Sequence, residues 1–140
     1  MLLESDILIA YMKKEDWLKD TSTNIIKAIE GGKLTNIQAS SEVFHELYYV
    51  FSDYAPLSTI MTNEAKIATM RNVKFIDPTK ETYLSALNVM ETYRLTSIFD
   101  AIYAATTLTE KVPDHTILST DKIYEKIKGI KRTDPRKLKL

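Results

Sequence analysis

Apolar and polar residues follow two different patterns along this chain, and the pattern changes near most of its glycines and prolines. Short apolar runs bounded by turn-forming residues predict buried strands, whereas apolar residues three or four positions apart predict helices. Five short runs fit the strand pattern: residues 2–5 (LLES), 34–40 (LTNIQAS), 73–77 (VKFID), 115–120 (HTILST) and 130–133 (IKRT).

Helical patterns fill most of the chain between these strands. Residues 20–30 begin with cap-forming side chains and stop at the glycine pair 31–32, a usual end for a helix. Further along, Val43, Leu47 and Val50 form one apolar stripe. Helices are predicted over residues 20–30, 41 to about 56, 57–72, 78–94, 97–110 and 122–129, and residues 6–12 continue the first strand as helix or turn.

The alternation of strands with helices predicts the fold class. Strands joined through helices require crossover connections, which indicates an α/β fold whose mostly parallel sheet is covered on both faces. No repeat or linker divides the 140 residues, so we expect a single domain over residues 1–140. In such sheets ligands bind beyond the carboxyl ends of the strands.

Composition narrows the class of protein further. With 44% hydrophobic and 27% charged residues the chain is predicted to be globular rather than disordered. The absence of cysteine excludes disulfides, thiolate catalysis and cysteine-ligated zinc. No apolar stretch approaches the roughly 20 residues of a membrane helix, and the N-terminus does not resemble a signal peptide. We therefore expect a cytoplasmic protein without a membrane partner.

Charge is balanced overall but unevenly distributed. Of the 19 basic and 19 acidic residues, eight basic and two acidic ones fall within residues 122–140. An acidic body with a basic tail is compatible with contact to a polyanion and equally with a solvated terminal segment.

Five acidic residues occupy positions that the predicted sheet would bring together. Glu4 and Asp6 follow the first strand, and Asp121 follows the strand 115–120. Glu46 lies early in the helix after the second strand, and Asp100 lies in the first turn of an almost wholly apolar helix. Carboxyl ends of parallel strands share one edge, so these side chains can converge there.

Converging carboxylates imply a cation. They repel one another, raise each other's pKa values and are costly as ions unless a positive charge neutralises them. Oxygen ligands without histidine or cysteine select Mg²⁺ or Mn²⁺, and such ions support phosphodiester hydrolysis.

Individual acids also have simpler interpretations. Asp100 suits a capping box with Ser97, and Asp121 suits a cap on the helix that follows it. Glu42 is predicted to be a solvated helix acid. Neither His45 nor His115 is expected to be catalytic, and Tyr48, Tyr49 and Tyr103 are assigned to packing rather than to base stacking.

Four segments together resemble a known family. LLESDILIAY, SSEVFHELYYV, FDAIYAATTL and ILSTDKIYEKI occur in the order seen in the PIN-domain nucleases, in particular the VapC-type toxins of toxin-antitoxin pairs. Glu46 before Leu47 matches the family glutamate, and Asp100 before Ala101 matches the third acid. Asp121 matches the fourth acid.

The first motif departs from the family pattern, in which an aspartate is usual at the position of Glu4. Glu4 is one methylene longer, and Asp6 occupies a position that is polar in the family. Either Glu4 still reaches a metal, or Asp6 becomes the principal ligand, or metal affinity is lost. Ser5 and Thr120 are expected to support the carboxylates by hydrogen bonding. Ile123 stands where many members carry a further acid.

The resemblance implies a three-layer α/β/α fold with a central parallel sheet of four or five strands. It also implies an endoribonuclease dependent on Mg²⁺ or Mn²⁺, a homodimer and a small antitoxin partner. The basic residues Lys131, Arg132, Arg136 and Lys137 are candidates for contact with the RNA backbone beside the acidic cleft.

Two other interpretations stay open. A degenerate PIN domain would keep the fold and bind RNA or protein without cleavage, as Glu4 and Ile123 suggest. A phosphoacceptor signalling domain would use Asp77 after a middle strand and Lys122 after a late one, but it leaves Glu46 and Asp100 unexplained.

Overall fold

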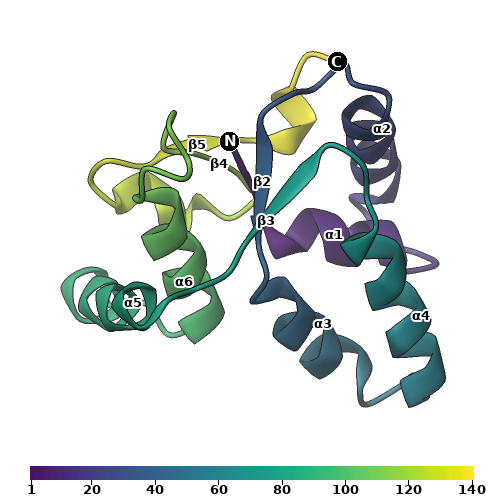
Figure 1. Cartoon of the computed structure of the whole chain (residues 1–140), viewed down its shortest axis with the longest axis horizontal. Helices are drawn as coiled ribbons and strands as arrows, with labels where there is room; N and C mark the ends of the chain where they lie inside the picture. The colour runs from purple at the N-terminus through teal and green to yellow at the C-terminus, as the bar shows by residue number, and fades with distance from the viewer.

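The computed structural model describes all 140 residues and contains one five-stranded sheet flanked by helices (Figure 1). Every strand pairs in parallel with its neighbour, in the order β3-β2-β1-β4-β5. The strands are β1 (Leu2–Leu3), β2 (Ile37–Ser40), β3 (Val73–Ile76), β4 (Thr116–Leu118) and β5 (Lys131–Thr133). The helices are α1 (Ser5–Met12), α2 (Lys19–Glu30), α3 (Val43–Phe51), α4 (Leu57–Ala68), α5 (Lys80–Tyr93) and α6 (Ile98–Thr107), with 3₁₀ turns η1 (Lys122–Lys126) and η2 (Pro135–Lys137).

The helices form two layers on opposite faces of the sheet. Helices α1 to α4 pack on one side and α5 and α6 on the other, with β2 running between them in Figure 1. Each side has its own cluster of buried apolar residues, and the two residues of β1 divide between them: Leu2 belongs to the α5–α6 cluster and Leu3 to the α1–α4 cluster. The predicted three-layer α/β/α fold with a central parallel sheet is confirmed.

The order of the strands determines which strand ends lie next to one another. The two-residue strand β1 is the middle of the sheet, and its backbone pairs with β2 on one side and β4 on the other. All five strands point the same way, so the residues after β1, β2 and β4 emerge at one edge. That edge is where the predicted acids follow their strands.

Several predicted elements are longer than the observed ones, and left-handed backbone lies close to the ends of two of them. The strand expected from residue 34 begins only at Ile37, because Asn36 adopts a left-handed φ of 57°. The helix expected to residue 72 ends at Ala68. Asn72 there has a φ of 64°, and its side chain donates to the Ile29 and Glu30 carbonyls at the end of α2.

Three further elements differ from the prediction. The helix expected over 41–56 ends at Phe51 and is followed by a turn before Pro56, which disfavours helical backbone in the residue that precedes it. The closing helix expected over 122–129 is only the short 3₁₀ turn η1. The turn η2 was not predicted at all. No helix combines the length and apolar character needed to cross a membrane.

Candidate functional site

The carboxyl edge of the sheet gathers acidic side chains from four segments of the chain. Glu4 is the residue between β1 and α1, and Asp6 lies in the first turn of α1. Glu46 and Asp100 lie in the first turns of α3 and α6, and Asp121 caps η1 after β4. The negative charges of Asp6 and Glu46 raise the pKa of Glu4, and those of Asp121, Glu46 and Asp6 raise the pKa of Asp100. We refer to Glu4, Asp6, Glu46, Asp100 and Asp121 as the acidic cluster.

Glu4 is the most deeply buried member, with 4% of its surface exposed. The Ser5 hydroxyl donates to its Oε1 at 2.6 Å, and the Ser119 hydroxyl donates to its Oε2 at 3.0 Å. Burial raises the pKa of Glu4 well above its usual range, and the charge of Asp6 raises it further. Glu46 acts on the same pKa in the same direction. Glu4 is therefore held by two hydroxyl groups in surroundings that favour its protonated form.

Asp6 has one satisfied and one free carboxylate oxygen. Its Oδ2 accepts from the Thr120 backbone N–H at 2.7 Å and from the Thr120 hydroxyl at 2.6 Å. Its Oδ1 is buried and has no hydrogen-bonding partner. A buried oxygen without a donor is costly, so this atom is a natural ligand for a cation.

Glu46 faces the cluster from α3 and is fixed by a tyrosine of α6. The hydroxyl of Tyr103, which is 1% exposed, donates to Glu46 Oε2 at 2.5 Å. Burial raises the pKa of Tyr103, and the negative charge of Glu46 adds to the effect. Tyr103 thus joins the two helical layers and orients Glu46. Tyr103 was predicted only to pack. Its hydrogen bond to Glu46 joins residues 57 positions apart.

Asp100 shows the electrostatic state of the cluster most clearly. Its pKa rises from the ordinary 3.8 to about 6, first through burial and then through the negative charges of Asp121, Glu46 and Asp6. The Tyr124 hydroxyl lowers this pKa, although the two groups are not aligned in a full hydrogen bond. The capping contact expected of Ser97 is also present, since its hydroxyl accepts from the Asp100 backbone N–H at 3.3 Å.

Asp121 makes the capping contact that was predicted for it. Its Oδ1 accepts from the Ile123 backbone N–H at 2.8 Å, so it caps η1. Its charge also raises the pKa of Asp100. The hydroxyl of Ser119, which is fully buried, accepts from the Asp121 backbone N–H at 2.9 Å and donates to Glu4. Ser119 was not predicted to take part, although a serine two residues before an acid is a familiar turn signal.

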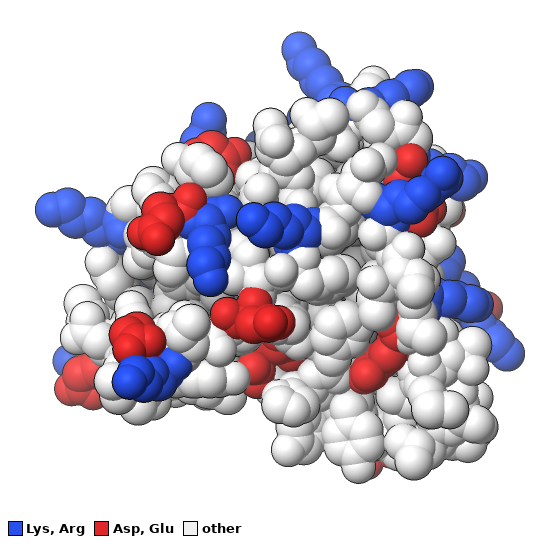
Figure 2. Space-filling model, viewed as in Figure 1, with Lys and Arg blue, Asp and Glu red and all other residues white.

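No basic side chain compensates this negative charge. None of the ion pairs in the structure includes a member of the acidic cluster. Figure 2 shows acidic side chains gathered in the middle of the molecular face, between the α5–α6 side and the α3–α4 side. Basic side chains lie above and around them in this view.

The donor set suits a hard divalent cation. Its members offer carboxylate oxygens only, and Asp6 Oδ1 lacks any other partner. In the present side-chain positions no group of three acidic or histidine residues is assembled tightly enough to enclose an ion. Asp6, Glu46, Asp100 and Asp121 are the residues whose oxygens would hold one.

Glu42 was predicted to be solvated, and that prediction is wrong. The residue is 9% exposed. Its carboxylate accepts from the Tyr83 hydroxyl of α5 at 3.0 Å and lies 3.0 Å from Nδ1 of His45. The tyrosine is 41 positions away in sequence, so no local pattern indicates this burial.

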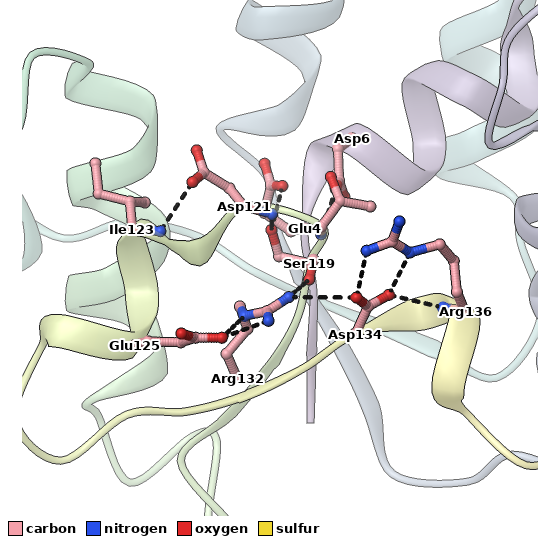
Figure 3. A network of polar contacts seen from close by, with 10 residues as sticks. Glu4, Asp6, Ser119, Asp121, Ile123, Glu125, Arg132, Asp134 and Arg136 are labelled. Carbon is pink, nitrogen blue, oxygen red and sulfur yellow. Dashed lines mark hydrogen bonds and ion pairs between the residues drawn. The ribbon is translucent and has the colours of Figure 1, made fainter.

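The basic tail is less free than expected (Figure 3). The guanidinium of Arg132 is mostly buried and pairs with Glu125, with Asp134 3.9 Å away. Arg136 grips Asp134 with two hydrogen bonds and lies 5.5 Å from the ring centre of Trp17. The other two candidate RNA contacts, Lys131 and Lys137, are exposed.

The parallel sheet and the acidic cluster at its carboxyl edge define an α/β protein with an acidic site. A family model described as PIN domain matches residues 1–130, so the chain belongs to the PIN domain family. A sequence search among curated proteins finds no match.

Solved structures of similar fold come from toxin-antitoxin systems. They include VapBC2 from Rickettsia felis bound to a promoter DNA fragment, with a TM-score of 0.68, 16% identity and coverage of 94% of this chain and 96% of that one. VapC20 from Mycobacterium tuberculosis, described as a sarcin-ricin loop cleaving toxin, has a TM-score of 0.67, 15% identity and coverage of 86% and 89%. A toxin-antitoxin complex from Klebsiella pneumoniae has a TM-score of 0.64, 15% identity and coverage of 96% of both chains. At these identities the likeness establishes the fold.

Proposed function

We propose that this protein is a divalent-metal-dependent endoribonuclease and acts as the toxin of a VapBC-type toxin-antitoxin pair. The observation that carries the proposal is the acidic cluster: five acidic side chains from four segments, none of them in an ion pair, whose negative charges raise the pKa values of Glu4 and Asp100. An RNA phosphate brings further negative charge to this edge. Phosphate can approach such a cluster only when a cation is present.

The residues of the cluster divide the work. Asp6 would hold Mg²⁺ or Mn²⁺ through its unpartnered Oδ1, with Glu46, Asp100 and Asp121 as further ligands. A cation bound there supplies Lewis acidity toward the scissile phosphate. Tyr103 fixes Glu46, while Thr120 fixes Asp6. Glu4, saturated by Ser5 and Ser119, keeps the end of β1 in register with β4 rather than serving as the principal ligand.

Partners follow from the same assignment. RNA is the substrate, and we expect a small antitoxin to cover the acidic edge. Exposed apolar side chains on α4 (Leu57, Met61) and α5 (Leu84, Leu87) offer surface for the antitoxin and for a second copy of the chain. A toxin that cleaves RNA would work in the cytoplasm.

The test is cleavage of a pool of labelled single-stranded RNA oligonucleotides with Mn²⁺ or Mg²⁺, compared with EDTA. We expect metal-dependent products from the unchanged protein and a loss of at least about a hundredfold in rate for Glu46→Gln and Asp100→Asn. Glu81→Gln is the matched control, since Glu81 is also a first-turn helix acid but is exposed on α5. Cleavage that persists in EDTA or in both cluster variants would refute the proposal.

A second function, RNA or protein binding without cleavage, is favoured by one observation. Both oxygens of Glu4, at the position of the usual family aspartate, are already hydrogen-bonded. Calorimetric titration with Mn²⁺ separates the two functions: RNA binding with no metal uptake would identify the degenerate form. The phosphoacceptor alternative loses support, because Asp77 follows the edge strand β3, which two strands separate from β4, and its carboxylate accepts from the Ser41 hydroxyl.

A further inference from the structure

One peptide group is held from both sides at the edge of the acidic cluster. The carbonyl of Ser119 accepts from Nη1 of Arg132 at 3.0 Å. The N–H of the same peptide group, which belongs to Thr120, donates to Asp6 Oδ2 at 2.7 Å. A guanidinium and a carboxylate are therefore linked through a single amide (Figure 3).

The guanidinium is itself fixed in place. Nε and Nη2 of Arg132 both donate to Glu125 Oε1, and Nη1 lies 3.9 Å from Asp134. Asp134 in turn accepts hydrogen bonds from Nε and Nη2 of Arg136. The Arg132 side chain is 9% exposed, so it is directed inward rather than toward solvent. Its position suits a structural charge behind the cluster better than a contact with RNA.

Both hydrogen bonds of this peptide group affect how the Asp6 carboxylate is held. A positive charge on the carbonyl side polarises an amide and strengthens its N–H as a donor, as in any chain of hydrogen bonds in a low-dielectric environment. Asp6 Oδ2 then stays committed to Thr120, and the rotation of the carboxylate is fixed. The remaining oxygen, Oδ1, is the one that is buried without a partner.

We propose that Arg132 is a positioning residue for Asp6, acting through the peptide group between Ser119 and Thr120, and that it sets the affinity of the acidic cluster for a divalent cation. The inference rests on the proposed function, because it assigns the metal to that cluster. Arginine suits the task because its planar group donates to Glu125 and to the Ser119 carbonyl at the same time. Lysine, with one ammonium, keeps the charge but cannot reproduce both directions.

The experiment is calorimetric titration of the full-length protein with Mn²⁺, without RNA. We expect Arg132→Gln to weaken Mn²⁺ affinity by about tenfold, as removal of an outer partner of a metal ligand commonly does, and Arg132→Lys to weaken it by a smaller factor. Arg71→Gln is the matched control: this arginine is exposed, forms none of the ion pairs in the structure and lies outside both the link and the acidic cluster, so Mn²⁺ affinity should stay unchanged.

Two further measurements keep a structural effect apart from a positioning effect. Urea midpoints of the three variants in EDTA show whether each is folded, and Arg132→Lys provides the test if Arg132→Gln does not fold. Binding of a labelled RNA oligonucleotide in EDTA should be the same for Arg132→Gln and the unchanged protein. If Arg132 contacted the RNA backbone, Arg132→Gln would instead weaken RNA binding and reduce its salt dependence.

The outcomes distinguish this inference from the proposed function. An unchanged protein that binds no Mn²⁺ would overturn the proposed function and the inference with it. Strong Mn²⁺ binding that is equal in the unchanged protein and in folded Arg132 variants would overturn the role of Arg132 alone. Weakened RNA binding with unaltered Mn²⁺ affinity would show that Arg132 contacts RNA and does not position Asp6, which would overturn the inference.

Discussion

Replacing Asp100 by asparagine should make the metal-free protein more stable while it removes activity. Asparagine has nearly the shape of aspartate but carries no charge. In the folded protein the Asp100 carboxylate is opposed by burial and by the charges of Asp121, Glu46 and Asp6. In the unfolded chain it is free of all of these. Removing the charge therefore relieves the folded state alone.

The size of the effect follows from the pKa. A rise from 3.8 to about 6 corresponds to about 3 kcal/mol at 1.36 kcal/mol for each unit. Asp100 is only partly buried, so solvent screening reduces this to about 1–2 kcal/mol. Loss of a first-turn acid costs about 0.3–1 kcal/mol through the helix dipole. The net gain should be about 1 kcal/mol, or roughly 3 °C in Tm.

The pH dependence has a definite sign. A carboxylate whose pKa is higher in the folded state destabilises that state once it ionises, so stability falls as pH rises from about 4 through about 6. The advantage of Asp100→Asn should be full at pH 7.5 and small near pH 4. Glu4 adds to the trend in both proteins, because its pKa is also raised.

Urea denaturation in EDTA at these two pH values measures the difference. Glu81→Gln again serves as control, because it loses the dipole interaction of an exposed first-turn acid without leaving a crowded site. A small loss of stability is expected for it at pH 7.5. If Asp100→Asn loses as much stability as Glu81→Gln at that pH, the repulsion attributed to the acidic cluster does not exist.

Three other changes test neighbouring parts of the structure. Tyr103→Phe removes the donor to Glu46 and should weaken Mn²⁺ affinity about tenfold in a calorimetric titration; unaltered affinity would show that Glu46 needs no fixing. Glu42→Ala removes the acceptor shared by the Tyr83 hydroxyl and His45, both of which are exposed, and should lower the unfolding free energy by about 0.5–1.5 kcal/mol in urea, with RNA cleavage retained. Mn²⁺ at about a hundredfold above its Kd should stabilise the unchanged protein by about 2.7 kcal/mol, and a Tm that ignores the ion would exclude a site in the folded state.

The sheet and its helices could be predicted because their signals are local. The strands β1 to β4 lie in short, largely apolar runs, and most helices carry an apolar stripe, so the alternation and hence the parallel topology follow from neighbouring residues. The positions of the five acids after strands or in first turns were equally visible. Boundaries such as Asn36, where the backbone turns left-handed, depend on how the loop meets the rest of the molecule.

The side-chain partners could not be predicted, because they join distant segments. Glu42 is buried by a tyrosine of α5, and Glu46 is fixed by a tyrosine of α6. The basic tail was predicted to be solvated or to contact a polyanion, whereas Arg132 is hydrogen-bonded to Ser119, which lies 13 positions earlier and directly after β4. Sequence periodicity shows which face a residue occupies within its own element but not what lies opposite.

The two residues of β1 and the one that follows them have three different surroundings. Leu2 is buried with α5 and α6, Leu3 with α1 to α4, and Glu4 closes against Ser119. A slip of one position would exchange the two apolar interiors and drive a carboxylate into one of them. Residues 2–4 are thus needed both for folding and for the shape of the acidic cluster. If these three positions were randomised and active variants selected, we expect almost no sequence diversity there. Adaptation toward new substrates would have to begin elsewhere, in the segments after β4 and on the outer turns of α3.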